Sequence, residues 1–66
     1  MIEYFVPYAK DKKDKNGHEI HFQTGKIDDM WIVDVFEDEN YIGRDRNDFP
    51  RLVDAEKYIN SEIAKI

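Results

Sequence analysis

The sequence predicts an α+β domain, in which an antiparallel three- to four-stranded β-meander carries one C-terminal α-helix packed on one face. Apolar and polar residues alternate, as in half-buried strands, over residues 2–9 and 18–24. Two further alternating segments, 30–36 and 41–44, flank an acidic turn. After residue 51 the apolar spacing changes to the three- and four-residue steps of a helix. With 66 residues and no linker, the chain is expected to form a single domain.

The first two strands are expected to pair as a hairpin. Residues 2–9 contain Pro7, which cannot donate a backbone hydrogen bond, so this strand is expected at the sheet edge. The next segment, 10–15, is rich in lysine and is followed by Asn16-Gly17, a strong turn signal. We therefore expect a loop over 10–17 and a second strand over 18–24.

The central hairpin is formed by the segments 30–36 and 41–44. Its turn closes over residues 37–40 or, more tightly, over Asp38 and Glu39, and both closures give the same register. Two pairs lie next to the turn in this register: Phe36 with Tyr41, and Val35 with Ile42. Three consecutive hairpin connections then place the strands side by side in chain order.

The register divides the hairpin into two faces, because side chains alternate along a strand. The apolar face consists of Trp31, Val33, Val35 and Ile42. The other face is mixed and consists of Ile32, Asp34, Phe36, Tyr41 and Gly43. Two aromatic rings and an isoleucine are more than a solvated face needs, which makes this second face the best candidate for an interaction surface.

The helix is expected over residues 52–65. Its apolar stripe consists of Leu52, Ala55, Ile59, Ile63 and Ile66. We expect this stripe to pack on Ile20, Phe22, Trp31, Val33, Val35 and Ile42. One helix covers one face of such a sheet, so nothing within the chain is expected to cover the opposite face.

Composition restricts the class of protein. The chain has no cysteine, which excludes disulfide bonds and cysteine-ligated zinc and is typical of a reducing compartment. The N-terminal residues lack the pattern of a signal peptide, and no apolar run is long enough to span a membrane. We therefore expect a cytoplasmic protein without a membrane partner. Its net charge of −5 disfavours nonspecific binding to nucleic acid.

No residue pattern indicates catalysis, a cofactor or a metal ion. His18 and His21 are three residues apart, which on a strand places them on opposite faces. Ser61 is the only serine and is expected on the exposed side of the helix, away from a base. The carboxylates cluster at turns rather than in a predicted cleft. We expect a non-enzyme with no cofactor and no metal site.

The sequence therefore favours a small acidic protein-interaction module of the regulator or inhibitor type. The expected binding residues are Phe5, Ile32, Asp34, Phe36 and Tyr41. The partner is a protein, favoured to be basic by Asp34 and the acidic turn, or a second copy of the chain in a homodimer. In a sharper version the acidic surface imitates the phosphate charge of nucleic acid. The alternative to any docking surface is that another segment of the chain covers these side chains.

A nucleic-acid-binding sheet is the rival function. Aromatic side chains on an open sheet can stack bases, and Arg44, Arg46 and Arg51 would contact phosphates. Asp45 and Asp48 interleave with these arginines, so self-neutralised loops are the simpler interpretation.

Overall fold

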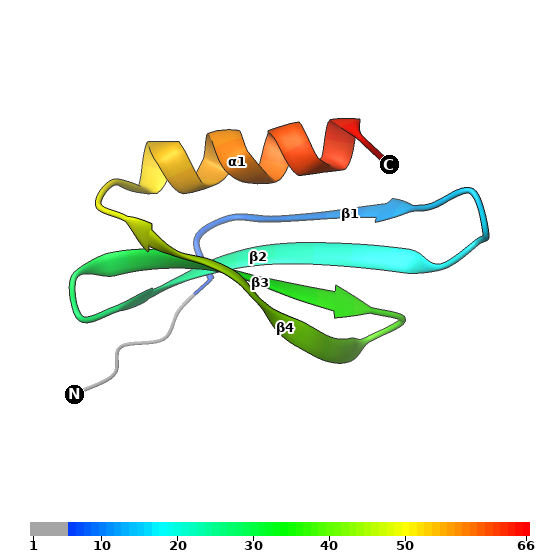
Figure 1. The fold of residues 1–66 in the computed structure, drawn as a ribbon, viewed down its shortest axis with the longest axis horizontal. Helices are drawn as coiled ribbons and strands as arrows, with labels where there is room; N and C mark the ends of the chain where they lie inside the picture. Colours follow the sequence, from blue (N-terminus) through cyan, green and yellow to red (C-terminus); the bar gives the residue numbers. More distant parts are fainter. Residues whose placement is uncertain (1–5) are drawn as a thin grey trace.

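Four strands and one helix make up residues 6–66, the part of the chain that the computed structural model describes. In chain order they are β1 (Ala9–Lys13), β2 (Glu19–Ile27), β3 (Met30–Glu37), β4 (Asn40–Phe49) and α1 (Leu52–Ala64). The strands form one antiparallel sheet in the order β1-β2-β3-β4, and α1 lies across one face of it (Figure 1). The predicted α+β meander with a C-terminal helix on one face is confirmed.

Two tight turns close the hairpins on either side of β3. Asp28 and Asp29 have φ of 49° and 65°, and Asp38 and Glu39 have φ of 49° and 73°. Positive φ at both central residues is the type I′ geometry, whose twist matches that of paired strands. Of the two closures that the sequence leaves open for the central hairpin, the structure has the tighter one, over Asp38 and Glu39. Asn-Gly or Asp-Gly is the favoured pair in such turns, yet here all four positions are acidic.

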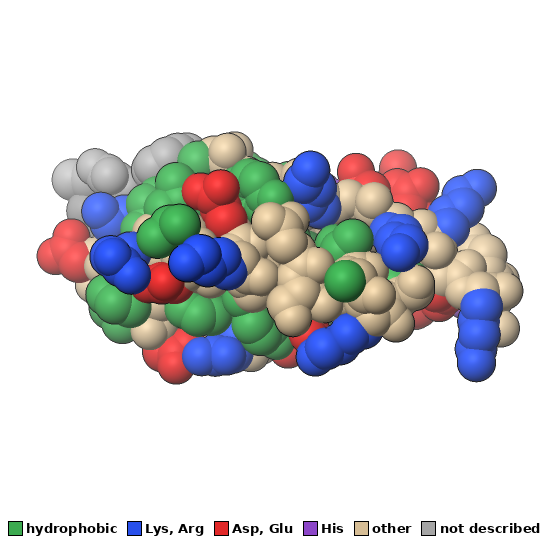
Figure 2. Space-filling view, turned by 90° about the horizontal axis from the view of Figure 1, so that it is seen from above, with side chains coloured by type: hydrophobic (Ala, Val, Ile, Leu, Met, Phe, Trp, Pro, Cys, Tyr) green, Lys and Arg blue, Asp and Glu red, His purple; other side chains and the backbone are tan. Residues whose placement is uncertain are grey.

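The core lies between α1 and the sheet. Phe22 and Val33 from the sheet and Ala55 and Ile59 from the helix are buried together. The half-buried side chains around them are Tyr8, Ile20, Trp31, Val35, Phe49, Tyr58, Ile63 and Ile66. The expected core residues of β2 and β3 are thus on the helix side. Seen from that side, the surface shows lysines and arginines interspersed with carboxylates (Figure 2).

Strand β4 is longer and less regular than the sequence predicted. It was expected to end at residue 44, but it continues to Phe49 and pairs with β3 through three shifts in register. Phe36 is paired with Tyr41 as expected, whereas Val35 is paired with Gly43 instead of Ile42. Ile42 is the extra residue between these pairs and forms a β-bulge, and the adjacent Gly43 adopts φ of 148°. Ile42 is therefore 58% exposed, which corrects its expected place in the core.

Strand β1 is shifted along the chain from its expected position. Residues 2–5 of the predicted strand 2–9 lie outside the described residues, and the observed strand begins at Ala9. The segment predicted as a lysine-rich loop therefore supplies most of the edge strand. Lys12 extends toward the helix, where its Nζ donates to the Ile63 carbonyl at 3.4 Å. Within residues 6–66, no helix has the length and apolar character needed to cross a membrane.

Candidate functional site

The sheet register aligns one side chain from each strand on the face that points away from α1, here called the outer face. Asp11 of β1 is paired with His21 of β2, His21 with Phe36 of β3, and Phe36 with Tyr41 of β4. These four residues are called the outer row below. Because paired residues point to the same side of a sheet, the row runs across the whole width of the meander.

The members of the outer row hold one another in place. His21 Nδ1 contacts the Asp11 carboxylate, and its Nε2 lies 3.0 Å from Gln23 Oε1. The His21 and Phe36 ring centres are 5.6 Å apart with an interplanar angle of 68°. Phe36 and Tyr41 are related in the same way, at 5.4 Å and 62°. These edge-to-face arrangements are the favoured geometry for ring pairs and fix the orientation of the row.

An ion pair between the buried Asp34 and the exposed Arg44 supports the Tyr41 end of the outer row. The Arg44 Nε donates to Asp34 Oδ1 at 3.0 Å, and the Tyr41 hydroxyl contacts the same oxygen at 3.4 Å. Asp34 is only 4% exposed. A carboxylate removed from water is stable only with such partners, so Asp34 acts as an anchor for Arg44 and Tyr41.

A shallow hollow of about 340 Å³ lies beside Phe36 on the outer face. Its lining consists of Asp11, Glu19, His21, Gln23, Phe36 and Glu39. The hollow therefore combines three carboxylates with an aromatic side chain, and among residues 6–66 no lysine or arginine contributes to its wall. Lys13 is the nearest basic residue by register, because it is paired with Glu19 on the same face.

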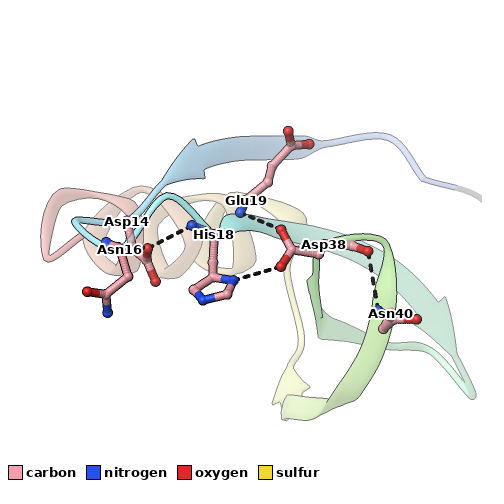
Figure 3. A network of polar contacts seen from close by, with 6 residues as sticks. All are labelled: Asp14, Asn16, His18, Glu19, Asp38 and Asn40. Carbon is pink, nitrogen blue, oxygen red and sulfur yellow. Dashed lines mark hydrogen bonds and ion pairs between the residues drawn. The ribbon is translucent and has the colours of Figure 1, made fainter.

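A second network fixes the acidic end of this hollow (Figure 3). Asp38 Oδ2 lies 2.7 Å from His18 Nδ1, and Asp38 Oδ1 accepts the Glu19 backbone N–H at 2.9 Å. The Asp38 N–H donates in turn to the Glu19 carbonyl at 2.9 Å. The hydrogen bond to Asp38 raises the pKa of His18, and the same bond lowers the pKa of Asp38. The β3–β4 turn is thereby tied to the start of β2, which brings Glu39 and Glu19 to one hollow.

The five residues expected to bind a partner are distributed unevenly. Tyr41 is 55% exposed and Phe36 is half-buried, and both lie in the outer row. Asp34 is also on the outer face but is buried in its ion pair, and Ile32 on the same face is only 2% exposed. The expectation that nothing in the chain covers this face is therefore wrong at Ile32. Phe5 lies outside the described residues. The accessible part of the expected patch is therefore the pair of rings, joined by His21, Gln23 and the carboxylates of the hollow.

The three arginines of the nucleic-acid alternative do not share a surface. Arg44 is bound to Asp34 on the outer face, whereas Arg46 donates to both oxygens of Asp48 at 2.9 and 3.0 Å. The Arg46 guanidinium also lies over the rings of Phe49 and Tyr58, on the helix side. Arg51 stands at the start of α1 and pairs with Asp54 at 3.2 Å. Each guanidinium thus already faces a carboxylate of its own.

No family model matches this sequence, and the searches of curated proteins and of solved structures give no match either. The surface itself therefore carries the functional argument. Within residues 6–66, no three His, Asp or Glu side chains are grouped so that they could hold a metal ion. The two histidines contact different carboxylates, His18 that of Asp38 and His21 that of Asp11.

Sequence reasoning missed the part of the site that comes from β1 and β2. Asp11, His21 and Gln23 were not among the expected binding residues, and neither was Glu39. A signal for His21 was present: a two-residue turn at Asp28-Asp29 fixes the register of β2 and pairs His21 with Phe36. Asp11 had no such signal, because β1 lies in a segment without apolar alternation.

Proposed function

We propose that this chain is a non-catalytic protein-interaction module that binds a basic protein partner on its outer face. The observation that carries the proposal is the exposed ring of Tyr41 packed against Phe36, beside a hollow walled by three carboxylates. A few residues supply most of the binding energy in a protein interface, tyrosine is enriched among them, and side chains that are already fixed lose little entropy on binding. Such a module acts by occupying a surface of its partner, as a regulator or an inhibitor does.

Charge favours a basic partner over a second copy of the chain. In a symmetric dimer the same patch lies on both sides of the interface, so the carboxylates of the two hollows would face each other. Like charges placed together across an interface are costly, whereas a positive surface gains both affinity and association rate. The overall charge of −5 attracts a basic protein at long range as well.

The same charges weigh against nucleic acid. The rings of the outer row could stack on bases, but the neighbouring carboxylates repel phosphates. Arg44 is the only guanidinium near the row among the described residues, and it is held by the buried Asp34. The outer face therefore suits a protein better than a nucleic-acid strand.

Two neighbouring residues provide a matched test. Tyr41 and Ile42 have nearly the same exposed fraction, 55% and 58%, but Tyr41 lies in the outer row and Ile42 borders a groove with Phe22 on the helix side. Tyr41→Ser should abolish retention of a basic protein from an extract of the source organism, while Ile42→Ser should leave it unchanged. The retained protein should also be released by salt, because exposed charges are screened. Thermal unfolding of both variants checks that the fold is intact.

Other results would contradict the proposal. If Tyr41→Ser still captures the same proteins as the wild-type chain, the outer face is not the docking surface. Light scattering that shows a dimer lost in Tyr41→Ser would identify a second copy as the occupant. Chemical-shift changes in the outer row on adding a short single-stranded oligonucleotide at low salt would favour the nucleic-acid function instead.

A further inference from the structure

We infer that the hollow beside Phe36 binds the guanidinium group of an arginine side chain from the partner. The inference rests on the proposed function and specifies which chemical group the outer face recognises. It follows from the kinds of side chain in the hollow, from the partners that each already has, and from the way this protein holds one of its own arginines.

The lining of the hollow matches a planar cation. A guanidinium is attracted to an aromatic ring, here that of Phe36, and donates charge-assisted hydrogen bonds to carboxylates. The hollow measures about 340 Å³, near the lower end of the roughly 300–1,000 Å³ found for ligand pockets. That space suits one long side chain better than a larger ligand.

The three carboxylates differ in how far they are already engaged. Asp11 is held by His21, and Glu19 lies opposite Lys13 in the register. Glu39 projects from the type I′ turn, and its side chain has no hydrogen-bond partner among residues 6–66. Glu39 is therefore the carboxylate best placed to accept the hydrogen bonds of an incoming cation.

The protein's own Arg46 shows the arrangement that we expect in the hollow. Its guanidinium lies 4.6 Å from the Phe49 ring centre and 5.1 Å from that of Tyr58, while Asp48 accepts two hydrogen bonds from its edge. A planar group can do both at once, whereas the compact ammonium of lysine cannot form the two parallel bonds of a fork. The combination of ring and carboxylates in the hollow therefore favours arginine over lysine.

Titration with three short peptides tests the inference. The peptides carry arginine, lysine or citrulline at the centre of an otherwise all-threonine sequence; citrulline has nearly the shape of arginine without its charge. In ¹H–¹⁵N correlation spectra of the full chain at low ionic strength, the arginine peptide should shift the backbone amide signals of His21, Phe36 and Glu39. Its dissociation constant should be about tenfold lower than that of the citrulline peptide.

Two turn variants supply a matched pair. Glu39→Gly and Asp29→Gly each replace the second residue of a type I′ turn and remove one carboxylate, but only Glu39 lines the hollow. Glu39→Gly should weaken binding of the arginine peptide about fivefold to tenfold, and Asp29→Gly should leave it within about twofold. Both changes are expected to stabilise the fold, so weaker binding by Glu39→Gly cannot be attributed to unfolding.

Each contrary result has a definite meaning. If citrulline or lysine binds as tightly as arginine, or if no peptide shifts the three signals, the hollow does not recognise a guanidinium and the inference fails. The docking proposal is judged separately by Tyr41→Ser in the capture experiment. Loss of capture in that variant, with no preference for arginine among the peptides, would reject the inference while leaving the proposed function standing.

Discussion

Replacing Glu39 by glycine should make this protein more stable. Glu39 is the second residue of the β3–β4 turn and has φ of 73°, a left-handed conformation in which a side chain crowds the backbone. Aspartate tolerates this region because its short side chain can bond locally, but glutamate has no such advantage. Asp38 already fits the first turn position, so Glu39→Gly creates the favoured Asp-Gly pair.

The size of the gain follows from two opposing effects. The left-handed conformation costs an L-residue about 1–2 kcal/mol, which the glycine variant recovers. The glycine variant has a more flexible unfolded chain, which lowers the free energy of unfolding by roughly 0.5–1 kcal/mol. Taken from the middle of these two ranges, the net increase in the free energy of unfolding is about 0.5–1 kcal/mol. In a domain of this size, about 4–8 °C per kcal/mol corresponds to a rise in the unfolding temperature of roughly 2–8 °C.

Thermal and urea unfolding followed by circular dichroism would measure the gain. Glu39→Gln is the control: it removes the charge but keeps the strained side chain, so its unfolding temperature should stay close to that of the wild type. Asp29→Gly should give a smaller increase than Glu39→Gly, because an aspartate is replaced. An unfolding temperature for Glu39→Gly at or below that of the wild type would refute the reasoning about the turn.

Three further predictions concern ionisation and the core. The pKa of His18 is raised above 6.5 by its hydrogen bond to Asp38. The stability that protonated His18 gains from this bond is therefore complete below pH 6.5 and is lost as pH rises through the folded-state pKa. The pKa of Asp38 is lowered below 3.8, so the stability that ionised Asp38 contributes is lost as pH falls through its folded-state pKa. The urea midpoint of Asp38→Asn should therefore lie below that of the wild type mostly between about pH 4 and 6.5, with little difference at pH 8. Burial and the 2.6 Å hydrogen bond to Asp45 raise the pKa of Tyr58. An alkaline absorbance titration should therefore show a tyrosine that ionises at higher pH than the others, and Asp45→Asn should lower the pH at which it ionises. Ile59 is completely buried, so Ile59→Ala should cost about 2–5 kcal/mol and leave a largely unfolded chain with a poorly dispersed NMR spectrum.

The fold was predictable wherever apolar spacing was regular. The helix and the two central strands carry the periods of their elements, and the pair of Phe36 with Tyr41 follows from the turn alone. Edge strands were harder, because their residues are charged. Strand β1 lies in a run of lysines and aspartates, and the second half of β4 contains two arginines and two aspartates. In both, charged side chains that form ion pairs stand where apolar alternation would indicate a strand.

The site was predictable only in part, because one extra residue in a strand exposes a side chain and reverses the faces of the residues that follow it. Gly43 permits the bulge that moves Ile42 out of the core, and a glycine within a strand is the recognised sequence signal for such a bulge. The burial of Asp34 could not be read from the sequence. It depends on Arg44, whose place beside Asp34 is set by a register shift in the same irregular strand.

The edges of the sheet explain why a partner would use its face. Strand addition requires an accessible edge with a regular row of backbone groups, and proteins discourage it with lysines, charges and bulges. Strand β1 carries three lysines in five residues, and β4 combines bulges with a charged sequence. With both edges protected, recognition at the outer face must come from side chains rather than from backbone pairing. The partner segment that we propose can then be helical, extended or irregular, provided that it delivers a cationic side chain to the rings and carboxylates of the outer face.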